Sequence, residues 1–394
     1  MAVSRREVFR RLAPGVPAGA FLAARGREAW VAEHWGEEQA AAAPRKTLAI
    51  RLNSNENPLG PSGAARKAIE QAFTYAGRYP MNARPAINDL RTLLAKKHGL
   101  NPNQVALGAG SGEILDSAVR AFTSPTRGLV AGLPTFEAPA RVATRMKSAV
   151  TEVRVDDDGR LDLEKMIAAA NGAGLVFVCN PNNPTGSLHP AAAIADLVPR
   201  IRKASPDTVI LVDEAYHDYV TDPAYSTAIP LAAQHPNVLV SRTFSKAYGM
   251  AGLRLGYVVG HAEAVARLSR WSMPYNANAM AVGAAVVSLD DEEQIARERR
   301  RNAEVLKYTS DFFRAAGMRL TDSQANFIWV DLGRPAQEFR EACEKQGVLV
   351  GRPFPPFEKS HCRISIGTMD EMRRALGVFR TVLGLTTTTT AGGR

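Results

Sequence analysis

The chain has 394 residues, 45% of them hydrophobic and 22% charged, which is the composition of a globular protein large enough for two domains. Lys and Arg outnumber Asp and Glu by 49 to 39, but the basic residues are scattered and no basic run is interleaved with aromatic residues, so no nucleic-acid partner is expected. The three cysteines have no CxxC spacing and no apolar run has the length of a membrane span, so we expect no disulfide framework, no metal site and no transmembrane segment.

Residues 1–45 are predicted to be an N-terminal extension that ends in a linker. Within it, Ser4–Arg10 resembles a twin-arginine export signal, because a serine, two arginines, two apolar residues and a further base occur in that order. A modest apolar stretch follows and is interrupted by Pro14 and Pro17. We therefore expect a periplasmic or secreted protein. A cytoplasmic protein with an uninformative basic extension is the open alternative.

From about residue 48, short β-branched runs alternate with amphipathic stretches such as 111–123 and 190–204. Strands that alternate with helices indicate βαβ units and a mainly parallel sheet. The runs 175–180 and 208–213 are apolar almost throughout, as a sheet covered on both faces requires. The predicted strands of this sheet are 105–108, 129–132, 150–155, 175–180, 208–213, 238–242 and 255–259.

After about Trp271 the pattern changes to a long charged helix over 290–316. A second group of strands and helices follows, with strands near 325–331, 347–351 and 362–366. We therefore predict four further parts of the chain: a segment that packs on the small domain, a large domain, a small C-terminal domain and a disordered tail. Their predicted bounds are 46–64, 65–270, 271–384 and 385–394.

Polar segments directly follow three predicted strands, at Asn180–Gly186, Asp213–Tyr216 and Ser241–Lys246. In an open parallel sheet the ligand binds beyond the carboxyl ends of the strands, so we expect these segments to converge on one crevice. The first segment contains two prolines and a glycine, which predict a rigid turn that presents Asn183.

The third segment carries the most specific chemistry. Lys246 is flanked by the hydroxyls of Thr243 and Ser245, and Arg254 follows eight residues later. Hydroxyls and a guanidinium suit a phosphate dianion. A lysine beside a phosphate anchor suits a Schiff base with an aldehyde cofactor.

This segment resembles the lysine signature of class I/II (fold type I) aminotransferases that use pyridoxal 5′-phosphate (PLP), and is most similar to the histidinol-phosphate aminotransferase group. The resemblance spans roughly residues 48–380, with its motifs in the family's order. It implies a mainly parallel seven-stranded sheet in a large domain and a smaller α+β C-terminal domain. It also implies that PLP is bound to Lys246, which serves as general acid and base.

The resemblance assigns further cofactor contacts. Asp213 is expected at the pyridine nitrogen, and Asn183 and Tyr216 at the 3-oxygen of the ring. Gly112 stands where the histidinol-phosphate group usually has an acidic residue, so the cofactor is indicated more firmly than the substrate. The ring-stacking residue is expected to be Phe136, and the phosphate contacts are expected from Gly110, Ser111, Gly112, Thr243, Ser245 and Arg254.

The substrate and subunit contacts are also implied by the resemblance. Arg363 is expected to grip the substrate α-carboxylate, with Asn183 beside it. Asn55 lies in the segment that closes over the substrate, and Arg352 falls near a position that binds a distal phosphate. Tyr79 corresponds to a tyrosine that crosses a homodimer interface to the neighbouring cofactor phosphate, so each site would need both subunits.

The expected activity is transfer of an amino group from a histidinol phosphate-like or aromatic donor to a 2-oxo acid, with 2-oxoglutarate as the expected acceptor. A decarboxylase or lyase of the same fold, similar to threonine-phosphate decarboxylase, is the alternative, because PLP chemistry depends on which Cα bond stands perpendicular to the ring. A non-catalytic binding module that kept the fold is a third possibility, which the complete set of site residues disfavours.

Overall fold

The computed structural model describes residues 49–385, and residues 50–385 form one compact unit. The predicted N-terminal extension with its export signal, and the tail from residue 386, lie outside the described residues. The strands are β1 (Ile50–Leu52), β2 (Val105–Gly108), β3 (Leu129–Leu133), β4 (Val150–Arg154), β5 (Leu175–Cys179), β6 (Val209–Asp213), β7 (Val238–Thr243), β8 (Gly256–Gly260), β9 (Phe327–Asp331), β10 (Val348–Val350) and β11 (His361–Ser365).

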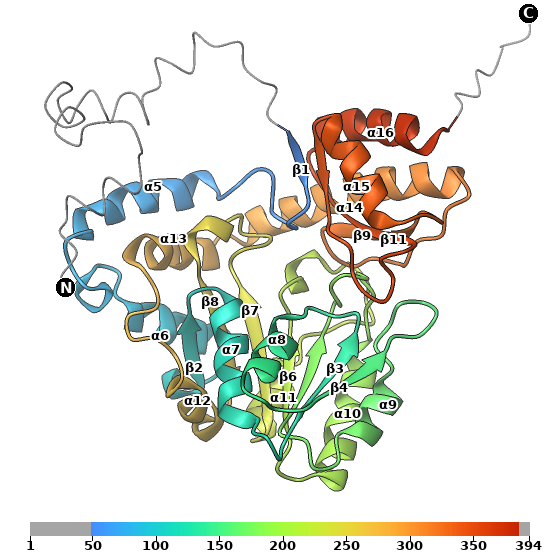
Figure 1. Cartoon of the computed structure of the whole chain (residues 1–394). Helices are drawn as coiled ribbons and strands as arrows, with labels where there is room; N and C mark the ends of the chain where they lie inside the picture. The colour runs from blue at the N-terminus through green and yellow to red at the C-terminus, as the bar shows by residue number, and fades with distance from the viewer. Residues whose placement is uncertain (1–48, 386–394) are drawn as a thin grey trace, which may run out of the picture. The chain divides into compact units, whose positions relative to one another are not determined.

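The α-helices surround these strands (Figure 1). They are α5 (Gly63–Ala72), α6 (Ile87–Lys97), α7 (Ser111–Phe122), α8 (Ala138–Arg145), α9 (Leu163–Ala169), α10 (Ala191–Ala204), α11 (Ile229–Gln234), α12 (Ala262–Ser269), α13 (Ala279–Leu289), α14 (Glu292–Ala315), α15 (Ala336–Lys345) and α16 (Met369–Leu383). Single turns of 3₁₀ helix lie at Phe73–Tyr75, Pro80–Asn82, Pro102–Gln104, His217–Tyr219 and Ala251–Leu253.

The main sheet has seven strands in the order β2-β8-β7-β6-β5-β3-β4. Its neighbouring strands are parallel from β4 through to β7, and β8 is antiparallel to both β7 and β2. The prediction of a mainly parallel seven-stranded sheet is therefore confirmed. Each of the seven predicted strands lies within two residues of the observed one, because the apolar runs end where the polar loops begin.

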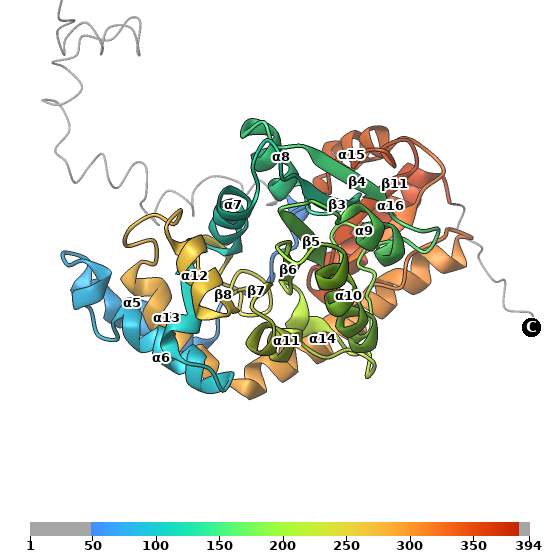
Figure 2. The same ribbon diagram turned by 90° about the horizontal axis from the view of Figure 1, so that it is seen from below.

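Both faces of this sheet are buried, and the alternation of side chains along the strands explains how. In β5, Val176 and Val178 belong to the hydrophobic cluster that includes α10, α11 and α13, whereas Leu175 and Phe177 belong to the cluster beneath α7, α8 and α12. Figure 2 shows α7 and α8 on one side of the strands and α10 and α11 on the other. Period-two alternation between two covered faces leaves no polar position in the strand, which is why β5 reads as a continuous apolar run.

The C-terminal part has a separate hydrophobic cluster built from α14, α15, α16 and the strands β9 to β11. Strand β9 pairs antiparallel with β11, and β1 pairs parallel with β10, so the first described strand lies in this part. Helix α13 behaves differently, because Ala281, Val282 and Ala285 pack into the cluster of the main sheet. The sequence pattern placed the change of domain before this helix, at 271.

Candidate active site

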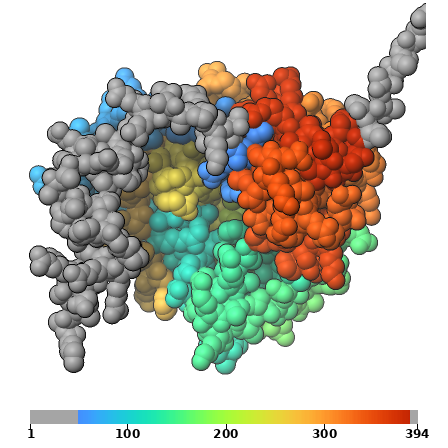
Figure 3. All heavy atoms as spheres, turned by 45° about the horizontal axis from the view of Figure 1, so that its top comes forward, coloured from blue at the N-terminus to red at the C-terminus, as the bar shows by residue number. Residues whose placement is uncertain are grey.

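A cavity of about 500 Å³ lies at the carboxyl ends of the parallel strands. Figure 3 shows the surface hollowed between the blue segment that follows residue 50, the teal region of α7 and the yellow segment near residue 250. All three predicted polar segments contribute to its wall, so their convergence is confirmed. The predicted residues that line it are Asn55, Ser111, Gly112, Phe136, Asn183, Asp213, Tyr216, Thr243, Ser245, Lys246, Arg254, Arg352 and Arg363.

Lys246 lies in the loop after β7 and points into this cavity. Its Nζ donates hydrogen bonds to two backbone carbonyls of the N-terminal segment, Ser54 at 3.3 Å and Asn55 at 3.1 Å. Burial, reinforced by the nearby positive charge of Arg363, lowers the pKa of Lys246 to about 8. A larger fraction of this amine is therefore neutral and nucleophilic near neutral pH than in an ordinary lysine.

Asp213 is the last residue of β6 and is almost fully buried. Its carboxylate accepts a hydrogen bond of 2.8 Å from the hydroxyl of Ser241, which lies opposite it on the neighbouring strand β7. Burial raises the pKa of Asp213 to about 6. A buried carboxylate with so little compensation is suited to a protonated ring nitrogen, whose positive charge would favour the ionised form.

Arg363 approaches the same cavity from β11 and is buried, with its guanidinium facing Asn183. One terminal nitrogen donates to Asn183 Oδ1 at 2.8 Å and the other to the carbonyl of Asn53 at 2.6 Å. Its Nε is buried without a partner, and burial lowers the pKa of this arginine. A buried guanidinium with an unused donor is suited to a carboxylate ligand.

Hydroxyls and a guanidinium form an anion cradle, defined here as Ser111, Thr243, Ser245 and Arg254, at the N-terminus of α7. Arg254 Nη1 donates to Ser245 Oγ at 3.2 Å, and Thr243 Oγ1 bonds the same Ser245 oxygen at 2.9 Å. Helix α7 has no side-chain cap, so its first N–H groups remain available to an anion. Gly110, at the cap position, has φ of 76°, and a Cβ there would collide with Nη2 of Arg254. These features fit a phosphate group.

The comparisons with known proteins agree with this chemistry. Residues 48–379 match the sequence model of the aminotransferase class I and II family. The chain belongs to this family. The histidinol-phosphate aminotransferase of Symbiobacterium thermophilum is 38% identical over 85% of this chain and 91% of its own length. The aromatic amino acid aminotransferase of Thermobifida fusca is 35% identical over 84% of this chain and 89% of its own length.

Solved structures support the same fold. The crystal structure of histidinol-phosphate aminotransferase from Sinorhizobium meliloti in complex with PLP has a TM-score of 0.78 and 26% identity, covering 97% of this chain and 98% of that one. The threonine-phosphate decarboxylase from Porphyromonas gingivalis, at 22% identity and a TM-score of 0.72, is similar in fold alone. The protein is a PLP-dependent aminotransferase of fold type I.

Three of the residues predicted for the site are placed differently from the rest. Tyr79 does not line the cavity of its own chain, and 65% of it is exposed. Asn55 lines the cavity, but its side chain bonds to Tyr216 and Ser365 within the protein. Gly110 lies behind Arg254 and leaves space for that guanidinium. Whether they bind cofactor or substrate stays a prediction.

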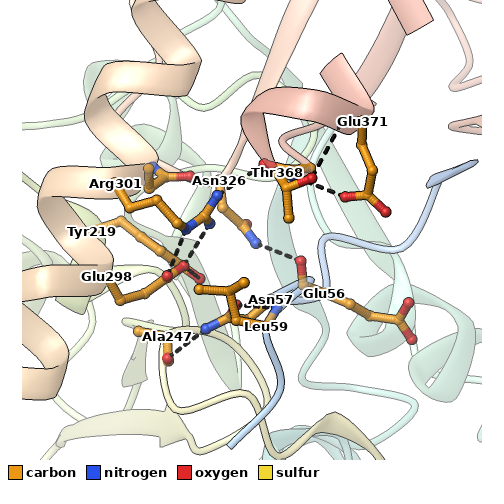
Figure 4. A network of polar contacts seen from close by, with 12 residues as sticks. Glu56, Asn57, Leu59, Tyr219, Ala247, Glu298, Arg301, Asn326, Thr368 and Glu371 are labelled. Atoms are coloured by element: carbon orange, nitrogen blue, oxygen red, sulfur yellow. Dashed lines mark hydrogen bonds and ion pairs between the residues drawn. The ribbon is translucent and has the colours of Figure 1, made fainter. Parts of the chain in front are cut away.

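The N-terminal segment is held over the site by contacts that the sequence analysis did not identify. The carbonyl of Asn55 accepts from Asn326 Nδ2 at 3.0 Å as well as from Lys246. Asn57 Nδ2 donates to the carbonyl of Ala247 at 2.9 Å (Figure 4). Asn55 itself has φ of 55°, a left-handed conformation that asparagine tolerates better than most residues. These contacts join residues far apart in the sequence, so no local pattern indicated them.

A buried ion pair supports the loop that follows Asp213. Arg242 Nη2 lies 2.9 Å from Glu214 Oε2, and the side chains are 11% and 1% exposed. Glu214 also accepts from the hydroxyl of Thr227 and from the backbone N–H of Ala228. Its carboxylate therefore has the additional partners that a buried charge requires. The sequence signal for this pair was the alternation of side chains along β6 and β7. Glu214 follows Asp213, which lines the cavity, and Arg242 follows Ser241, which hydrogen-bonds to Asp213, so both are expected to point away from the cavity.

Two other features of residues 49–385 complete the description. A second cavity of about 630 Å³ lies beside β9 and β11, and none of the predicted site residues lines it. Among these residues, no helix combines the length and the apolar character needed to cross a bilayer.

Proposed function

We propose that this aminotransferase moves an amino group from a histidinol phosphate-like or aromatic donor to a 2-oxo acid, with 2-oxoglutarate as acceptor and PLP held on Lys246. The observation that carries the proposal is the arrangement of the cavity. A lysine with a lowered pKa lines one cavity together with a buried carboxylate, Asp213, and the anion cradle around Arg254. The donor class is taken from the relatives, which are named for histidinol phosphate and for aromatic amino acids.

Bound PLP supplies an electron sink for the electrons of a broken Cα bond. The chain's own residues would orient the reactants and move the proton. Asp213 would hold the ring nitrogen in its protonated form, and Asn183 and Tyr216 would hold the 3-oxygen. Lys246 Nζ, released by the incoming amine, would take the proton from the substrate Cα and return it at C4′ of the cofactor.

Substrate orientation would decide the reaction that follows. Arg363 would bind the carboxylate of an aromatic amino acid or of the 2-oxo acid, or the phosphate of a histidinol phosphate-like donor, which has no carboxylate, displacing its present contacts with Asn183 and Asn53. For an amino-acid donor this grip would hold the Cα–H bond, rather than the Cα–carboxylate bond, in line for cleavage. Transamination is therefore favoured over the decarboxylase alternative, which also has less support among the relatives.

The test is a half-reaction with the purified holoenzyme. Borohydride should trap PLP on the peptide containing Lys246, and Lys246→Ala should abolish the trapping. A productive donor should convert the cofactor to pyridoxamine phosphate and release an oxo product, which 2-oxoglutarate then reverses. Release of CO₂ without an oxo product would refute the proposal.

We propose that the enzyme is a homodimer in which Tyr79 reaches the cofactor phosphate of the partner subunit. Tyr79 is one of several large apolar side chains that are exposed on this chain, and exposed apolar side chains that gather into a patch commonly mark interfaces. The ring of Tyr79 packs at 5.0 Å from that of Tyr275, which is 52% exposed. Phe73, Trp271 and Met273 are also at least half exposed. Light scattering should give twice the chain mass, and Tyr79→Ala should weaken PLP binding. A monomeric active holoenzyme would refute this proposal.

We propose that the chain is exported through the twin-arginine signal at Ser4–Arg10. Support comes from the sequence motif and from the fact that this route carries folded proteins, which suits an enzyme that acquires PLP in the cytoplasm. The mass of the mature N-terminus in the periplasmic fraction, compared with an Arg5→Lys, Arg6→Lys variant, tests it. An intact N-terminus found solely in the cytoplasm would refute it.

A further inference from the structure

One asparagine of the N-terminal segment joins a tyrosine of the cavity wall to the strand that carries Arg363. Asn55 is buried, and its side-chain amide donates from Nδ2 to the hydroxyl of Tyr216 at 3.0 Å. Its Oδ1 accepts a hydrogen bond of 2.7 Å from the hydroxyl of Ser365, the last residue of β11. The amide of Asn55 therefore presents a donor to Tyr216 and an acceptor to β11.

The backbone of Asn55 fixes the direction of these hydrogen bonds. Its N–H donates to Ser365 Oγ at 2.8 Å, so this hydroxyl already accepts one hydrogen bond. Ser365 is buried, and within residues 49–385 its proton has one acceptor, Asn55 Oδ1. If the amide were turned round, the buried proton of Ser365 would lose that acceptor, which is unfavourable. The amide nitrogen is therefore the atom that points at Tyr216.

This arrangement leaves Tyr216 with a proton to donate. A phenol has one proton, and because the oxygen of Tyr216 accepts from Asn55, that proton is not used in their hydrogen bond. Tyr216 lines the cavity, and burial raises its pKa, so the hydroxyl keeps its proton across the neutral range. The hydrogen-bond chain from Ser365 through Asn55 to Tyr216 therefore ends at the cavity wall with an unused donor.

We propose that Asn55 is a positioning residue that directs the hydroxyl of Tyr216 to donate a hydrogen bond to the 3-oxygen of PLP. The inference rests on the proposed function, which places PLP on Lys246 and Tyr216 at the 3-oxygen, and it explains why the tyrosine acts there as a donor. A donor stabilises negative charge on the 3-oxygen, so the neighbouring Schiff-base nitrogen holds its proton less tightly. The polarity of one amide is thus transmitted to the cofactor through one hydroxyl.

Asn55→Asp reverses this polarity with little change of shape. Aspartate keeps an acceptor for Ser365 and replaces the donating nitrogen with a second acceptor, so Tyr216 should donate to position 55 instead of to PLP. The backbone should accept the change, because Asn55 has φ of 55° and both Asn and Asp tolerate this conformation. The positive charge of Arg363, which lines the same cavity, favours the ionised form of the aspartate.

The readout is the pH midpoint at which the visible absorbance of the PLP-loaded enzyme changes, because this midpoint reports the Schiff-base proton. Tyr216→Phe should raise the midpoint by about 1–2 pH units, because the charged 3-oxygen loses a hydrogen bond. Asn55→Asp should raise it by about the same amount for the same reason. In the Tyr216→Phe background, Asn55→Asp should add less than about 0.5 pH unit, because both changes remove one shared hydrogen bond. Lys246, Asp213 and Arg363, the charged groups near Tyr216, are the same in every variant.

Asn57→Asp is the matched control for added charge and for disturbance of the N-terminal segment. Asn57 is also buried, and its Nδ2 donates to the carbonyl of Ala247 at 2.9 Å. It does not line the cavity and is not bonded to Tyr216. Because its charge has no hydrogen-bond path to the 3-oxygen, the control should move the midpoint by less than about 0.5 pH unit.

A second variant keeps the inference testable if aspartate at position 55 prevents folding. Asn55→Gly suits the left-handed backbone and removes the amide. Tyr216 keeps its proton, but a hydroxyl that accepts no hydrogen bond is a weaker donor. The midpoint should therefore rise by about 0.3–1 pH unit in Asn55→Gly, and this rise should vanish in the Tyr216→Phe background.

Three results would overturn the inference while the proposed function stands. These are a wild-type midpoint in Asn55→Asp or, if that variant does not fold, in Asn55→Gly; an equally large shift in Asn57→Asp; and a shift from Asn55→Asp that is the same with and without the hydroxyl of Tyr216. If Tyr216→Phe leaves the midpoint unchanged, the proposed contact of Tyr216 with the 3-oxygen fails together with this inference. If borohydride traps no PLP on Lys246, the proposed function itself fails.

Discussion

The contact between Gly110 and Arg254 predicts a specific effect of a single methyl group. Alanine at position 110 would have to adopt φ of 76° and would push Nη2 of Arg254 out of its place. The backbone conformation costs about 1–2 kcal/mol for a residue with a Cβ. Because the colliding atom is the end of a flexible side chain, the fold itself should suffer little more than this. The cofactor phosphate, however, should lose the guanidinium.

A hydrogen bond to a charged group contributes about 1.5–3 kcal/mol, so Gly110→Ala should bind PLP about 10- to 150-fold more weakly. Gly172→Ala is the matched control, because Gly172 has φ of 73° and a Cβ there would contact nothing. Urea unfolding of the two apoenzymes should show similar losses of stability. Titration of each apoenzyme with PLP, followed by absorbance, should separate them. Equal PLP affinities in the two variants would refute the placing of the phosphate beside Arg254.

Three further predictions follow from buried groups. The lowered pKa of Lys246, about 8, means that about 10% of the amine is neutral at pH 7, so stopped-flow capture of PLP by apoenzyme should speed up through pH 8 and level off above about pH 9. A rate still rising steeply at pH 10 would contradict this. Arg242→Met should lower the free energy of unfolding by about 3–5 kcal/mol, because it leaves Glu214 buried without its cation, and a loss under about 1 kcal/mol in urea would contradict it. Ser365→Ala should cost about 1–3 kcal/mol in the same assay, because the backbone N–H of Asn55, at 2.8 Å, loses its acceptor; an unchanged midpoint would show that water replaces the hydroxyl.

Much of the main sheet was predictable from the sequence because its strands are buried on both faces. Strands such as β5 and β6 are uninterrupted apolar runs that end in polar loops, so their bounds and the position of the crevice both followed. Many residues that line the cavity were predictable through motifs that lie within single loops, such as Asn180–Gly186 and Ser241–Lys246.

Contacts between distant loops were not predictable in this way. Ser241 supports Asp213 because the sheet register places them opposite each other, which requires the strand order as well as the strands. The Glu137–Arg352 pair joins a loop after β3 to a loop after β10, and each residue alone reads as an ordinary surface charge. Helix α13 follows the predicted boundary at 271 but packs into the core of the main sheet, because its small apolar residues carry no sequence signal for which core they enter.

The bonds that join Asn55 to Ser365 span 310 positions of the chain. Synthesis proceeds from the N-terminus, so the segment around Asn55 leaves the ribosome long before its partner strand β11 exists. Until then the main sheet can form with Asp213 and Lys246 already in place, but the cavity lacks Arg363 and its closing segment. Assembly of this enzyme should therefore end at the active site, and the substrate grip becomes available only once nearly the whole polypeptide has been made.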